Sequence, residues 1–150
     1  SDLKNINSEG WAKLENLNVK FNHPKFTGLA TLDFFSKFKK SDSLESTSKI
    51  ALNLNQMKIV LGSQFAKPSG IPLNAEFNFL GTGHELKIEH GAVQFYNLTP
   101  QVSGTLLNGP KITTKINTVI APTNLDGWEQ FLVPIPAHKA SGQIQGKIAY

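Results

Sequence analysis

Most of the chain alternates apolar and polar residues with a period of two, the pattern of a β-strand that buries one face. The most regular run is residues 73–79, "LNAEFNF", in which Leu73, Ala75, Phe77 and Phe79 alternate with polar residues. Comparable runs occupy residues 10–21, 26–39, 49–55, 57–61, 85–97, 101–107, 111–120 and 140–150. Turn residues separate these runs about every ten residues, which favours an antiparallel all-β fold with one wet face and one apolar face.

Three segments interrupt the alternation. Residues 39–48 are rich in Lys, Ser and Asp and are predicted to form a surface turn or mobile loop. The register shifts at Gly91, which indicates either a bulge or a turn between two strands. The sequence Lys67-Pro68-Ser69-Gly70 is predicted to be the turn that fixes the register of the strand beginning near Leu73.

One short helix is predicted within residues 123–136, "TNLDGWEQFLVPIP". Its apolar residues have helical spacing, Thr123 is a plausible N-cap, and Pro134 would end the helix. Residues 1–11 are a weaker second candidate for a helix.

Composition narrows the class of protein. The chain has 150 residues, of which 39% are hydrophobic and 17% charged, values that suit one folded domain. The net charge is +4, and all 15 cationic residues are lysine. Because arginine supplies most bidentate contacts to phosphate and guanine, we expect no nucleic-acid partner. Most of these lysines would be solvated surface, and weak attraction to anionic lipid headgroups is the alternative.

Catalytic and metal-binding patterns are lacking in the sequence. His84 and His90 are six residues apart, a spacing unlike common metal-ligand pairs, and the chain has no cysteine. No GxSxG motif, paired carboxylates or phosphate-binding loop is visible. We therefore expect a non-enzymatic protein with no cofactor and no metal. A hydrolase assembled from His90, Asp126 and Glu129 is the most distant alternative.

No apolar run approaches the ~20 residues of a membrane-spanning helix, and the N-terminus lacks the pattern of a signal peptide. The chain opens within a pattern and ends on the strand-like "GQIQGKIAY". We expect it to be a single domain-sized segment, residues 1–150, of a longer protein.

From about Leu52 onward, the order of features resembles the AsmA-like family of Gram-negative bacteria, which includes TamB-type bridge-like lipid transporters. The features are "LNLNQMKIVLG", the Lys-Pro-x-Gly-hydrophobic-Pro junction in "FAKPSGIPLNAEFNFLG", the strands around "LKIEHGAVQFYNLTPQVSGTL", and "TNLDGWEQFLVPIP" leading into "ASGQIQGKIAY".

This resemblance implies a strongly curved antiparallel sheet that forms an open groove, with one or two short helices. It implies a periplasmic location, an inner-membrane anchor elsewhere in the full-length protein, and phospholipid transport between the inner and outer membranes. The partners would be phospholipid acyl chains, flanking segments of the same protein, and inner- and outer-membrane components.

The residues expected to line such a groove share one face of the alternating strands. They are Leu52, Leu54, Leu73, Ala75, Phe77, Phe79, Leu86, Ile88, Val93, Phe95, Ile112, Ile116, Ile144 and Ile148. The alternative is a structural or adhesion β-sandwich, in which the same residues form a closed core.

Overall fold

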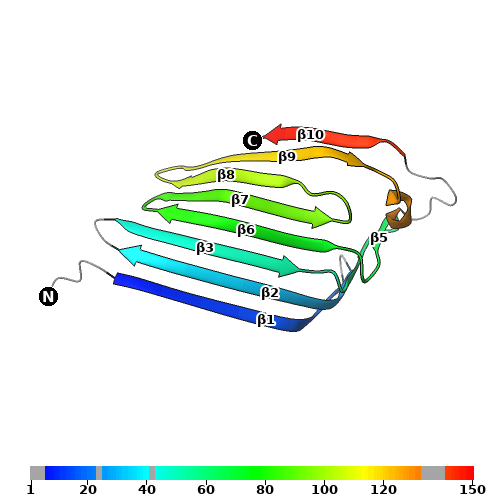
Figure 1. Cartoon of the computed structure of the whole chain (residues 1–150), viewed down its shortest axis with the longest axis horizontal. Helices are drawn as coiled ribbons and strands as arrows, with labels where there is room; N and C mark the ends of the chain where they lie inside the picture. Colours follow the sequence, from blue (N-terminus) through cyan, green and yellow to red (C-terminus); the bar gives the residue numbers. More distant parts are fainter. Residues whose placement is uncertain (1–5, 23–24, 41–42, 133–140) are drawn as a thin grey trace.

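The computed structural model describes residues 6–22, 25–40, 43–132 and 141–150, which form one antiparallel sheet of ten strands (Figure 1). The strand order is β10-β9-β8-β7-β6-β3-β2-β4-β5, and β1 pairs with the other edge of β2. The strands are β1 (Ile6–Asn22), β2 (Lys25–Lys40), β3 (Leu44–Asn53), β4 (Met57–Leu61), β5 (Phe65–Lys67), β6 (Leu73–Thr82), β7 (Glu85–Phe95), β8 (Gln101–Asn108), β9 (Ile112–Asn124) and β10 (Gln143–Ala149).

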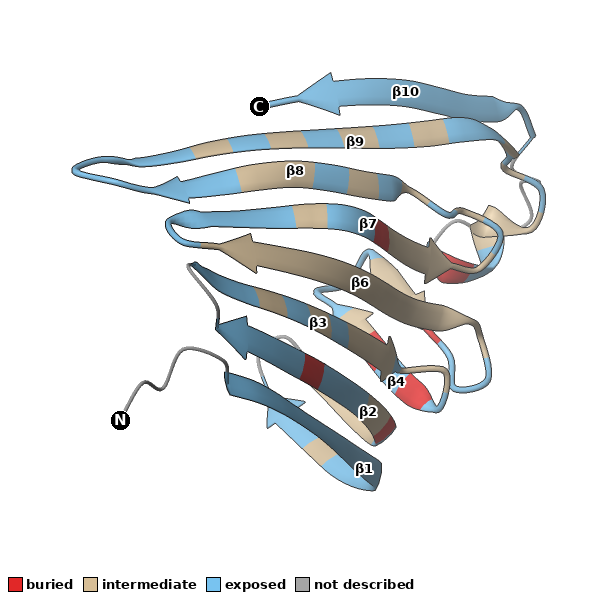
Figure 2. Cartoon of the chain, turned by 60° about the vertical axis from the view of Figure 1, so that its left-hand side comes forward, coloured by how far each residue is buried: buried red, intermediate tan, exposed pale blue. Residues whose placement is uncertain are grey.

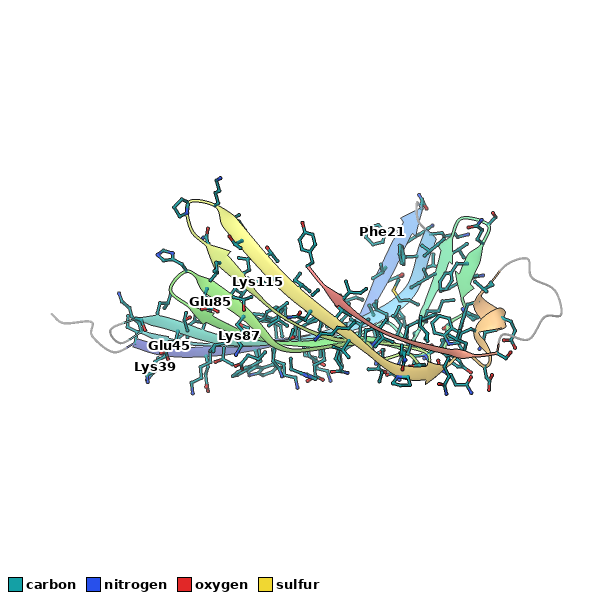
Figure 3. All side chains as sticks on the ribbon, turned by 90° about the horizontal axis from the view of Figure 1, so that it is seen from above. Phe21, Lys39, Glu45, Glu85, Lys87 and Lys115 are labelled. Carbon is teal, nitrogen blue, oxygen red and sulfur yellow. The ribbon has the colours of Figure 1, made fainter. Side chains whose placement is uncertain are left out.

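The sheet is strongly curled into a half-barrel that leaves an open groove (Figure 3), which is the shape that the family resemblance implied. Seen from above, the β8–β9 hairpin on the left and the strand that carries Phe21 on the right rise on the same side of the sheet (Figure 3). Phe21 projects into the concavity between them. We call the concave side the inner face and the opposite side the outer face. Because neighbouring strands pair in register, each cross-strand pair of residues shares one of these faces.

The curl depends on β2, which changes partner along one edge. Its residues 25–28 pair with β4, whereas residues 31–40 pair with β3. Gly28, with a φ of 141°, lies at this change of partner, opposite Met57 of β4 and Val19 of β1. The paired residues 17–22, 25–30, 57–61 and 65–67 therefore form a separate part of the sheet, which we call the arm.

Gly28→Ala should lower the free energy of unfolding by about 2 kcal/mol, because an alanine at this φ is strained and its Cβ would overlap the carbonyl oxygen of Gln56. The control is Gly62→Ala, which also has a positive φ, 61°, but open space around its Cβ. Urea unfolding of both variants measures the difference. Equal losses would show that contact with Gln56 is unimportant.

Buried residues lie in several places, including β2, β7 and the surroundings of the 3-10 turn (Figure 2), and the hydrophobic core cluster lies where the arm meets the rest of the sheet. Ala30, Met57 and Ile59 form its hydrophobic centre. Partly buried hydrophobic residues pack against this centre: Val19, Phe26, Leu54 and Leu73. Elsewhere the inner face is largely open, so the described strands do not form a closed sandwich core.

Lys67, predicted as part of the turn before β6, is the last residue of β5 and is completely buried, with 0% of its surface exposed. Its ammonium donates to four backbone carbonyls, at 3.3 Å to Leu54, 3.2 Å to Asn55, 2.8 Å to Met57 and 3.2 Å to Pro68. Burial lowers the pKa of Lys67 from its ordinary value of 10.5. The hydrogen bonds of this one ammonium thus join the β3–β4 turn to the β5–β6 connection.

Further hydrogen bonds join the same two connections. The backbone N–H of Gly70 donates to the Asn55 carbonyl at 2.8 Å, and that of Leu73 donates to Asn55 Oδ1 at 2.7 Å. The Ser69 hydroxyl donates to the Gln56 carbonyl at 3.2 Å. Ser69 and Gly70 therefore form the turn that leads into β6. The buried ammonium of Lys67, the last residue of β5, holds this connection in place through its hydrogen bonds.

A cluster of aromatic rings packs β5 of the arm against the segment that follows β9. Phe131 is 0% exposed, and its ring centroid lies 4.9 Å from that of Phe95, 5.3 Å from that of Tyr96 and 6.3 Å from that of Phe65. Phe65 also forms an isolated antiparallel bridge with Leu132. As a result β5, the last strand in the order, meets the segment that follows β9 (Figure 1).

The predicted helix in residues 123–136 is wrong in both type and extent. The structure has one 3-10 turn, η1 (Trp128–Phe131), and Thr123 belongs to β9. The Thr123 hydroxyl donates to Ala121, so it does not cap a helix. Asn124 accepts from the Asp126 backbone N–H, and Gly127 has a φ of 83°. These two local turns leave no room for a longer helix, and Pro134 lies outside the described residues.

Other predicted boundaries also shift. Residues 6–11, in the weaker helix candidate, belong to β1, and residues 1–5 lie outside the described part. The predicted loop at residues 39–48 is shorter, because β2 runs to Lys40 and β3 begins at Leu44. At Gly91 the prediction of a bulge is confirmed: β7 is continuous, and its register shifts between Ile88 and Gly91.

Candidate functional site

The inner face brings together the residues predicted to line a groove. On β6, Leu73 pairs with Phe95, Ala75 with both Leu52 and Val93, and Phe79 with Ile88. Across the next strands, Ile88 and Ile116 both pair with Gly104. The register therefore aligns these apolar side chains in rows across the sheet.

The remaining predicted residues continue these rows. Phe77 pairs with Gly91, and a Cβ on that glycine would lie 2.7 Å from the Phe77 ring, so the glycine makes room for it. Leu86 pairs with Leu106, and Ile148 pairs with Thr118 on β9. Among the predicted residues that have no paired apolar neighbour, Leu54 lies just beyond β3, Ile112 pairs with Asn108, and Ile144 pairs with Thr123.

Bulges on β1, β7 and β9 keep the rows aligned, the last where the β9–β10 register shifts between Ile144 and Gly146. On β1, the register shifts between Leu14 and Leu17, and Asn16 has a φ of 54°. On β7, Glu89 is the extra residue between Ile88 and His90. Each bulge adds a residue where strict alternation would move the following apolar residues to the opposite face.

The groove contains an apolar hollow of about 400 Å³ between the arm and β3. Its lining is almost entirely hydrophobic, and Leu52 and Leu54 are the predicted groove residues in it. We call this space the apolar hollow. It is lined by Leu17, Val19, Phe21, Phe26, Ala30, Leu32, Leu52, Leu54 and Met57.

Most of the lining of the apolar hollow was absent from the predicted groove residues. The alternation in residues 10–21 and 26–39 does place Leu17, Val19, Phe21, Ala30 and Leu32 on regular stripes. That these stripes face the same space as Leu52 depends on the pairing of β2 with both β3 and β4. No local pattern in the sequence predicts the pairing of β2 with both strands.

The inner face also carries polar side chains, among them Ser46, Thr114 and Thr118. The hydroxyls of Ser36 and Ser48 are 2.9 Å apart, and Ser36 is buried. Because the two hydroxyls satisfy each other, they add no unpaired polar group to the groove.

The outer face carries ion pairs. Lys49 Nζ lies 2.7 Å from Glu76 Oε1, and Lys87 Nζ lies 3.6 Å from Glu89 Oε1. A second hollow of about 530 Å³ on this face is lined mainly by polar residues, including Asp33, Asn74 and Gln94. Asn74 Nδ2 donates to Gln94 Oε1 at 3.1 Å.

The residues of the alternative hydrolase are not gathered in a pocket. His90 is exposed on the outer face of β7, opposite Asn78. Asp126 lies beyond β9 and accepts a hydrogen bond from the Asn124 side chain at 2.8 Å. Glu129 lies in η1. His84 lies in the β6–β7 turn, and His23 and His138 are outside the described residues.

Within the described residues, no group of three His, Cys, Asp or Glu side chains is placed to hold a metal ion. The same part of the chain contains no helix of the length and hydropathy needed to cross a bilayer.

The geometry therefore presents an open groove whose largely apolar inner face includes the apolar hollow. Comparison of the chain with protein-family models, curated proteins and solved structures found no match.

Proposed function

We propose that this chain is a non-enzymatic, lipid-binding segment whose groove holds phospholipid acyl chains. The observation that supports this most is the apolar hollow, which is open to solvent and has hydrophobic residues on all its described sides. Its volume, about 400 Å³, is in the range of small-molecule sites. Hydrocarbon is the ligand that such a lining favours, at about 0.8 kcal/mol for each buried methylene.

The curvature and the register support the same proposal. Rows of apolar residues extend from the apolar hollow across β6, β7, β8 and β9, whereas ion pairs lie on the outer face. An acyl chain lying on these rows would leave its polar headgroup in water at the open side of the groove. No covalent step and no cofactor are required.

The wider setting of the proposal comes from the resemblance to the AsmA-like family. In that setting the chain is a segment of a periplasmic groove through which phospholipids pass between the inner and outer membranes, with flanking segments of the same protein continuing it.

A photo-crosslinking amino acid at position 52 tests the proposal. Leu52 lines the apolar hollow, whereas the adjacent Asn53 lies on the outer face, opposite Thr31 and Asn74. After expression in bacteria and irradiation, we expect phospholipid adducts by mass spectrometry at position 52, at least about tenfold above position 53, because an apolar lining favours acyl chains. Equal labelling at both positions, or none at either, would contradict lipid binding in the groove.

A further inference from the structure

The outer end of the arm combines exposed apolar side chains with part of the lining of the apolar hollow. Phe21 is 61% exposed and packs edge-on against Phe26, with ring centroids 6.3 Å apart. Both rings also line the apolar hollow. Leu61, 44% exposed, lies at the same end, since its neighbour Val60 pairs with Lys25. Exposed apolar side chains at one end of the arm favour contact with an apolar phase.

The other face of the same end is basic. Thr27 of β2 pairs with Lys20 of β1 on one side and with Lys58 of β4 on the other, so both lysines share one face. Lys25 adds a third positive charge at the end of β2.

Negative charge is missing from this part of the sequence. Residues 16–32 and 54–75 contain no Asp or Glu, although the chain has 11 acidic residues. In the described part of the chain, the lysines in ion pairs are Lys13, Lys49 and Lys87, all outside the arm. Nothing within these segments therefore neutralises Lys20, Lys25 and Lys58.

We propose that the outer end of the arm docks on an anionic lipid bilayer, with Phe21 and Leu61 in the interface and Lys20, Lys25 and Lys58 against the headgroups. An apolar edge flanked by lysines matches a membrane surface, because the two attractions act together there. An acidic protein would match the lysines but would leave the exposed ring and leucine without a purpose. Docking in this orientation places Phe21 and Phe26, which line the apolar hollow, at the bilayer surface, and the uptake role that follows rests on the proposed function.

Sedimentation with vesicles tests the docking. The intact protein is expected to bind vesicles of phosphatidylglycerol and phosphatidylcholine, to bind pure phosphatidylcholine vesicles much less, and to lose binding as salt is raised. The triple variant Lys20→Gln, Lys25→Gln, Lys58→Gln should weaken binding at least about tenfold, since each lysine near the surface contributes roughly a fivefold effect. Its control, Lys37→Gln, Lys111→Gln, Lys115→Gln, has the same change in charge outside the arm and should weaken binding by no more than about twofold.

A second pair of variants tests the apolar part. Phe21→Ser should weaken vesicle binding by about fivefold or more, because it removes the exposed ring from the interface. Trp11→Ser is the matched control, since Trp11 is 80% exposed on the same strand but lies on the outer face away from the arm. Equal losses from the two lysine variants, or from the two aromatic variants, would overturn docking through the arm.

The docking and the groove can fail separately. Crosslinking at position 52 with phospholipid supplied in detergent does not depend on a bilayer, so the lysine variant of the arm should retain it. Retained crosslinking together with unselective vesicle binding contradicts the docking alone. Selective vesicle binding without crosslinking supports the docking and contradicts the groove.

Discussion

Phe131→Ala should lower the free energy of unfolding by about 3–5 kcal/mol, the range for truncating a fully buried phenylalanine. Phe131 has 0% exposure and is surrounded by Phe65, Phe95, Tyr96 and Trp128. Its removal leaves a cavity where β5 meets η1, and the ring pairs are lost as well. Urea unfolding followed by circular dichroism measures the loss.

The matched control is Phe35→Ala, because Phe35 is partly exposed on the outer face of β2. We expect this variant to lose about 1 kcal/mol. Hydrogen exchange should show the Phe131 effect most strongly in β5 and η1, since the ring joins them. A loss from Phe131→Ala no larger than that from Phe35→Ala would mean that the aromatic cluster does not hold this end of the sheet closed.

Lys67→Met is expected to cost about 2–4 kcal/mol, although methionine is close to lysine in length and is more hydrophobic. The ammonium satisfies four carbonyls at distances of 2.8–3.3 Å, and a thioether donates to none of them. Two of these carbonyls, those of Leu54 and Asn55, keep a backbone donor, which limits the loss. Thermal unfolding and urea unfolding both measure the effect.

Lys58→Met is the control for this substitution. Lys58 is exposed on β4, so its replacement should change the free energy of unfolding by no more than about 0.5 kcal/mol. If Lys67→Met were as stable as Lys58→Met, the carbonyls around Lys67 would have found water or other donors. The buried lysine would then be dispensable for the turn.

The faces of the strands could be predicted from the sequence because alternation is a local property. Phe77 and Phe79 share a face whatever their neighbours are, and the pairing with Ile50 and Ile88 then aligns whole rows. The shift near Gly91 was also visible, since the apolar positions change parity there. An all-β sheet with one apolar face follows from these observations.

The arm could not be predicted, because it depends on contacts between distant residues. Gly28 resembles any glycine in a strand until Gln56 lies against it. Lys67 resembles any surface lysine, since its acceptors are backbone carbonyls contributed mainly by residues 54–57. The spacing of Leu125, Trp128 and Phe131 suggested a helix, but it arises because Trp128 and Phe131 pack within the aromatic cluster around η1.

The topology also has a consequence for how the fold can be modified. The last pair between β3 and β6 is Asn53 with Asn74, and residues 54–73 lie outside that ladder. Topologically, β4 and β5 are an insertion into the connection of a β3–β6 hairpin. A two-residue turn could join Asn53 to Asn74 without changing their register. The described strands thus form a simple meander with one insertion. That insertion contains the buried Lys67 and also β4, whose Met57 lines the apolar hollow.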